Sequence, residues 1–127
     1  MQLSSGHWAI VGSTAATASS SGGPCRGIST WIFDGFEYIS LWGEMCWNGS
    51  KVWKYNSGAV CIQNPFPPIG YCFGYRDGVT APGWSSSIWG NFSVLNGGIP
   101  ECIMPRLYDW GNGSSNSAWY DNWGHFC

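Results

Sequence analysis

Six cysteines constrain the fold of this chain more than any other feature. They are widely spaced along the sequence, at Cys25, Cys46, Cys61, Cys72, Cys102 and Cys127. The count is even, and the close Cys or His pairs of a structural zinc site are missing. The pattern therefore predicts three disulfide bonds in a secreted, extracellular protein. The spacing does not choose among the alternative pairings.

Composition further narrows the class of protein. The chain has 127 residues, which fits one domain, and 17% of them are aromatic, including ten tryptophans. Only 9% are charged, the net charge is −2, and the five basic residues are scattered. A disordered chain would be rich in charge and poor in aromatics. Nucleic acids and anionic membranes attract clustered Lys and Arg, so neither is an expected partner.

Turn and strand signals predict an all-β protein. No window between Cys25 and Cys127 shows the 3.6-residue periodicity of an amphipathic helix. The dipeptides Asp34-Gly35 and Asn48-Gly49 each lie between β-prone segments, which is typical of a two-residue hairpin turn. Further strands are expected at Ala59–Gln63, Tyr71–Tyr75, Ile88–Leu95 and Ile103–Tyr108. We predict a small disulfide-stapled β-sandwich or barrel over residues 25–127.

Residues 1–24 differ from the rest of the chain. They are neutral and rich in Ser, Gly and Ala, with one apolar patch near the beginning. They lack the basic region and long apolar core of a signal peptide, and no segment of the chain is long and apolar enough to span a membrane. We expect an extended, flexible N-terminal arm that binds in a partner's groove. The expected contact residues are His7, Trp8, Ala9, Ile10 and Val11.

Two short stretches carry a family resemblance. One is the run Cys46-Trp47-Asn48-Gly49-Ser50-Lys51-Val52. The other is Pro100-Glu101-Cys102 with Pro105-Arg106-Leu107-Tyr108, followed by a Gly-Asn-Gly loop. These motifs resemble those of small exported actinobacterial proteins that are rich in Trp and Cys and dominated by β-structure. The layout of arm plus domain is also similar to that of the small adaptor of Streptomyces umbrella toxin particles. That likeness implies an arm inserted into a partner's cleft and a domain docked on a large toxin.

The residue inventory argues against catalysis. A Ser–His–acid triad needs a histidine held in the folded domain, and only His125, next to the C-terminus, qualifies. A glycosidase needs two carboxylates close together, and no pair stands out among Asp34, Glu37, Glu44, Glu101, Asp109 and Asp121. A cluster of Asp109, Asp121, Asn112, Asn116 and Asn122 is better explained as a polar loop than as a calcium site. We expect no enzyme activity, no metal and no cofactor.

Two binding functions remain. The first is a secreted, non-catalytic adaptor that links protein partners in an extracellular assembly such as an antibacterial toxin particle. The second is a carbohydrate-binding module that uses exposed aromatic faces framed by polar side chains. The candidate ligand surface for the second lies in the C-terminal stretch and comprises Trp110, Trp119, Tyr120 and Trp123. Most tryptophans of a small domain are expected in its core, and the neutral arm favours the adaptor.

Overall fold

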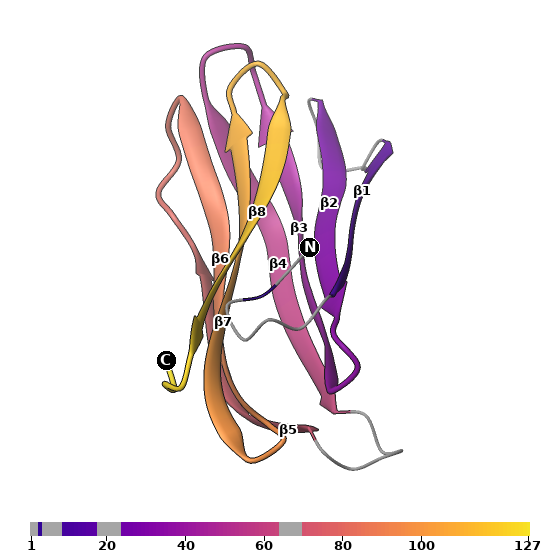
Figure 1. Cartoon of the computed structure of the whole chain (residues 1–127). Helices are drawn as coiled ribbons and strands as arrows, with labels where there is room; N and C mark the ends of the chain where they lie inside the picture. Colours follow the sequence, from indigo (N-terminus) through magenta and orange to yellow (C-terminus); the bar gives the residue numbers. More distant parts are fainter. Residues whose placement is uncertain (1–2, 4–8, 18–23, 64–69) are drawn as a thin grey trace.

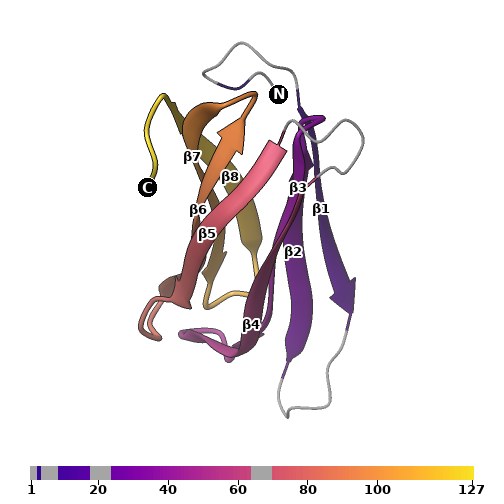
Figure 2. The same cartoon turned by 90° about the horizontal axis from the view of Figure 1, so that it is seen from below.

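The protein is a sandwich of two antiparallel four-stranded sheets, as Figures 1 and 2 show for a computed structural model. The structure describes residues 3, 9–17, 24–63 and 70–127, with the backbone alone for 13–17. Strand order follows chain order, so neighbouring strands are joined by hairpins within each sheet. The first sheet contains β1 (Ile10–Thr17), β2 (Cys25–Phe33), β3 (Glu37–Trp47) and β4 (Val52–Gln63). The second contains β5 (Gly70–Val79), β6 (Ser85–Asn96), β7 (Ile99–Trp110) and β8 (Ser115–Trp123).

The prediction of an all-β, disulfide-stapled fold is confirmed. Within the described residues there are strands and no helix, and consequently no helix that could cross a membrane. Alternation of apolar and polar residues explains the strands. In β6, for example, Ile88, Gly90, Phe92 and Val94 are buried, while the residues that alternate with them are only partly buried.

The two predicted turns are present, but each is longer than two residues. The last paired residues are Phe33 with Tyr38 around the first turn and Trp47 with Val52 around the second. Both turn glycines have positive φ, 90° at Gly35 and 93° at Gly49, which explains the choice of glycine. Side-chain capping explains the extra length. An oxygen of Asp34, like one of Asn48, accepts hydrogen bonds from two backbone N–H groups ahead in the turn.

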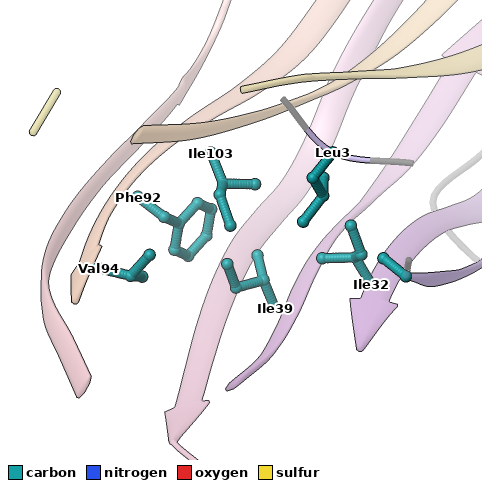
Figure 3. Close-up of a cluster of buried hydrophobic side chains, with 7 residues drawn as sticks. Leu3, Ile32, Ile39, Phe92, Val94 and Ile103 are labelled. Atoms are coloured by element: carbon teal, nitrogen blue, oxygen red, sulfur yellow. The ribbon is translucent and has the colours of Figure 1, made fainter. Parts of the chain in front are cut away.

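The core lies between the sheets in two apolar clusters. The first includes Leu3 and Ala9 together with side chains from both sheets, and Figure 3 shows Leu3 pointing toward Ile103 and Ile32. The second is centred on buried aliphatic residues toward the opposite end: Ile28, Leu41, Met45, Val52, Ile88 and Leu107. Residues from the N-terminal segment therefore belong to the core of the domain.

Part of the N-terminal segment, which we expected to be a flexible arm over residues 1–24, is paired with the domain. Strand β1 pairs along its whole length with β2, from Ile10 opposite Phe33 to Thr17 opposite Arg26. The physical reason is that β2 would otherwise expose a sheet edge. A β-prone segment a few residues away in the sequence pairs with that edge and satisfies the backbone hydrogen bonds of β2. The Thr30 hydroxyl also donates to the carbonyl of Gly12. The folded unit therefore begins before Cys25.

All six cysteines form disulfides, and the structure supplies the pairing. Cys25–Cys46 links the neighbouring strands β2 and β3. Cys61–Cys72 joins β4 to β5 and so ties one sheet to the other. Cys102–Cys127 fastens the C-terminal tail to β7. No free thiol remains.

The tryptophans occupy unexpected positions. None of those in the described residues is fully buried. Trp31, Trp42 and Trp89 sit on inner strands, and each ring occupies the space above a glycine that is its direct partner on an edge strand. Those glycines are Gly12, Gly58 and Gly78. The outer faces of the sheets, rather than the core, hold these large rings.

One ion pair crosses the interior. The Nζ atom of Lys54 on β4 lies 2.6 Å from Oδ1 of Asp109 on β7, and their side chains are 3% and 0% exposed. Burial lowers the pKa of Lys54 and raises the pKa of Asp109, while their mutual attraction opposes both shifts. The pair links the two sheets at a position where an unpaired charge would be costly.

Candidate functional site

A groove along β5 is a well-defined depression formed by residues that the structure describes. Its volume is about 570 Å³, and it is lined by residues of β5, β6 and the C-terminus: Phe73, Gly74, Tyr75, Arg76, Asn91, Ser93 and Cys127. The strand pairing shifts between Cys72 and Gly74, so Phe73 is left without a partner on β6. Such a bulge redirects the side chain. Phe73 is accordingly 62% exposed on the rim of the groove.

The C-terminal tail forms one wall of this groove. After β8, the N–H of Gly124 donates to the carbonyl of Pro100, and Cys127 is fixed both by its disulfide and by a hydrogen bond from its N–H to Ser93 Oγ. This path brings Phe126 onto Phe73, with ring centroids 4.9 Å apart and planes at 19°. The stacked pair is exposed on one side, which leaves an aromatic surface beside the groove.

Tyr75 borders the groove as part of β5, but its ring turns toward the inner face of the sheet. Its ring stacks on the buried Phe92 with centroids 5.1 Å apart, and its hydroxyl donates to the carbonyl of Ala59. These contacts fix the ring orientation although Tyr75 is 48% exposed. Tyr75 therefore fixes β5 against the first sheet and supports the groove from its inner side.

Polar groups of two kinds face the groove. Arg76 is exposed and makes no ion pair with any residue that the structure describes. Asn91 is held by Arg106, whose Nη2 donates to Asn91 Oδ1 at 3.1 Å while its Nη1 binds the carbonyls of Gly90 and Pro105. The Asn91 oxygen is therefore satisfied, and its amide nitrogen remains a donor. The groove combines ring faces with guanidinium and amide donors.

Three of the five expected arm residues lie in the part of the chain that the structure describes. Ala9 is buried in the core, while Ile10 at the start of β1 is 64% exposed and Val11 packs against the core cluster. His7 and Trp8 lie outside the described residues. Ile10 and Val11 thus belong to the edge strand of the first sheet.

The C-terminal aromatic residues lie on different faces and at different ends of strands β7 and β8. Trp119 packs against the core and donates from Nε1 to Thr30 Oγ1 at 2.8 Å. Tyr120 points the other way and is 51% exposed. Trp110 borders a separate depression of about 280 Å³ near the other end of the sheet. Trp123 is half-buried at the end of β8, opposite Glu101. These residues do not share one surface.

Three carboxylates that sequence reasoning left unpaired come together at one end of the sandwich. Asp34, Glu37 and Glu101 are buried, and one oxygen from each lies within 4.8 Å of the others. Burial raises the pKa of Glu37 to about 9, and the nearby Asp34 carboxylate adds to this shift. Burial likewise raises the pKa of Glu101 to about 8, with a further contribution from a hydrogen bond to Asp121. Asn96 is the neighbour that favours their ionised forms.

The remaining acidic residues have other surroundings. Asp109 pairs with Lys54, and Glu44 lies near the Cys25–Cys46 disulfide, whose sulfurs are not free to bind a metal. Of the loop cluster that we weighed as a calcium site, Asp121 lies beside Glu101 of the buried group, whereas Asp109 pairs with Lys54. Comparison with known proteins found no matching family model, no matching curated protein and no matching solved structure.

Proposed function

We propose that this protein is a secreted, non-catalytic binding module whose β5 groove takes a saccharide. The observation that carries the proposal is the exposed, stacked aromatic pair of Phe73 and Phe126 beside the free donors of Arg76 and Asn91. Sugar rings have apolar C–H faces and polar edges. A site that offers ring faces and a few placed polar groups is complementary to both.

The Arg76 guanidinium narrows the class of saccharide. Its donors form a planar fork that matches a carboxylate or sulfate group. No described carboxylate occupies that fork. An acidic sugar, such as a uronic acid, therefore fits the groove better than a neutral one. Three disulfides are typical of proteins that work outside the cell, where such polymers occur.

A glycan array followed by calorimetry with the best oligosaccharide tests this function. We expect Phe73→Ala and Arg76→Ala each to weaken binding by about tenfold or more, which is the loss of one stacking or charge-assisted contact. Tyr55→Ala is the matched control, because Tyr55 is 62% exposed but does not line the groove. Absence of any glycan ligand, or equal affinity for all three variants, would contradict the proposal.

A second candidate is the adaptor function, which the outer edge of β1 favours. Within the described sheets β1 pairs only with β2, so its other edge can accept a strand from a partner. The exposed Ile10 at its end offers an apolar contact. Co-purification from the extracellular medium, with Ile10→Lys as the variant, distinguishes this function. A partner retained at full yield by Ile10→Lys would count against the β1 edge as the interface.

A further inference from the structure

The buried carboxylates come from both sheets and form no ion pair with a Lys or Arg side chain. Asp34 lies in the turn between β2 and β3, Glu37 begins β3, and Glu101 lies in β7 beside its hairpin with β6. Their exposed fractions are 8%, 1% and 0%. Within the described residues, which include every Lys and Arg, the only ion pair is Lys54–Asp109, and it does not involve these carboxylates. A buried group of this kind needs a counterion or protons.

Several oxygens of this group have no hydrogen-bond donor. Asp34 uses Oδ1 to cap its turn, and Asn96 Nδ2 donates to Oε1 of Glu101 at 2.6 Å and to Oε1 of Glu37 at 3.4 Å. The other oxygen of each carboxylate is buried and unpartnered. The same is true of Asn96 Oδ1, although Asn96 is only 2% exposed. Native proteins leave few buried polar atoms unsatisfied, so this concentration points to a missing ligand.

Donor type and spacing identify the ligand. All the donors are oxygens, which suits a hard cation. Around a calcium ion, oxygens lie at about 2.3–2.6 Å from the metal, so two ligands on opposite sides are about 5 Å apart. The carboxylate oxygens of Asp34, Glu37 and Glu101 fall within that limit, at 4.8 Å or less. Magnesium requires shorter bonds and retains several waters, which a closed interior site does not favour.

We propose that Asp34, Glu37 and Glu101 form a calcium site with the side-chain oxygen of Asn96. In the structure Asn96 presents Nδ2 to the carboxylates. A half-turn of its amide exchanges Nδ2 and Oδ1, which are nearly equal in size, and brings the unpartnered oxygen onto the site. The ion would then join the β2–β3 turn to the β6–β7 end of the other sheet, at the lower end of the sandwich in Figure 1.

Direct calcium binding by the oxidised full-length chain tests the site. Protein freed of metal with EDTA is dialysed against CaCl₂, and bound calcium is measured by elemental analysis. We expect about one calcium per chain. We also expect the melting temperature to rise by about 5 °C or more at a calcium concentration a hundredfold above Kd. MgCl₂ at the same concentration should produce a much smaller rise.

Isosteric variants locate the ion. Glu37→Gln and Glu101→Gln should each lower calcium affinity by about tenfold or more, because each removes one anionic ligand. Asp77→Asn is the matched control, since Asp77 is an exposed carboxylate on β5 and should leave calcium binding unchanged. Less than a tenth of an equivalent of calcium on the wild-type chain would overturn the proposal. So would wild-type affinity in a folded Glu37→Gln or Glu101→Gln variant. The wild-type measurement decides the question even if a variant does not fold.

Discussion

The indole ring of Trp42 on β3 occupies the space that a side chain at position 58 on β4 would need. A Cβ atom at Gly58 would lie 2.7 Å from Cε2 of Trp42. Gly58 is the direct cross-strand partner of Trp42, so the ring covers the backbone of the edge strand. The same relationship links Trp89 to Gly78, where the Cβ would lie 2.8 Å from Cζ2. Aromatic coverage of an edge glycine compensates for its missing side chain.

Gly58→Ala should therefore destabilise the protein. Displacement of the Trp42 ring is a case of overpacking, which typically costs about 1–3 kcal/mol of unfolding free energy. Urea denaturation followed by tryptophan fluorescence measures the change. Gly74→Ala is the control, because a Cβ there meets nothing within 4 Å and φ is not positive. Equal stability of the two variants would show that the ring moves aside freely.

Leu3→Ala should also destabilise the domain, because Leu3 is 3% exposed within the first core cluster. Truncation of a buried leucine costs about 2–5 kcal/mol. Ile10→Ala, at a position that is 64% exposed, should change the unfolding free energy by less than about 0.5 kcal/mol. Thermal unfolding of the two variants checks this. Wild-type stability in Leu3→Ala would restore the view of residues 1–24 as a detachable arm.

Asp109→Asn should be among the most damaging substitutions in the chain. It leaves the Lys54 ammonium buried without its partner, which costs about 3–5 kcal/mol. The double variant Lys54→Met/Asp109→Leu removes both charges and should recover most of that loss. Chemical denaturation of the single and double variants gives the comparison. A double variant no more stable than the single one would mean that the pair contributes more than charge balance.

In the presence of EDTA, stability should fall as pH rises. Glu37 has an ordinary pKa of 4.5 and a pKa of about 9 in the folded protein, so the folded state binds its proton more tightly than the unfolded chain does. The stabilisation is complete below pH 4.5 and is lost as pH rises toward about 9. Urea midpoints between pH 4 and pH 9 measure this. Glu37→Gln should flatten the dependence, and an unchanged slope in that variant would assign it to other groups.

Part of this architecture is accessible from sequence because strand alternation is a local signal. Turn dipeptides at Asp34-Gly35 and Asn48-Gly49 place two hairpins, and an even number of cysteines predicts the absence of free thiols. The alternation of inward and outward residues along β3 also indicates one member of the carboxylate site. Glu37 shares its strand face with Ile39 and Leu41, which directs it into the core.

The rest depends on contacts between distant segments. Phe73 and Phe126 meet only because a bulge turns one outward and a disulfide holds the other across the sheet. The position of Trp42 depends on cross-strand register, since a shift of one residue would remove Gly58 from beneath it. The length and neutrality of residues 1–24 suggested independence, but neither property reports whether β2 lacks a neighbour.

Each sheet is built from one continuous stretch of sequence, so a single break in the chain between β4 and β5 separates the strands of one sheet from those of the other. A protease cut between residues 63 and 70 would produce two polypeptides, each with a complete set of four hydrogen-bonded strands. Cys61–Cys72 would keep them covalently joined, so the nicked protein would migrate as one species until it was reduced. The fold is thus a natural candidate for a split reporter, in which two separately expressed halves regain the sandwich only when they are brought together.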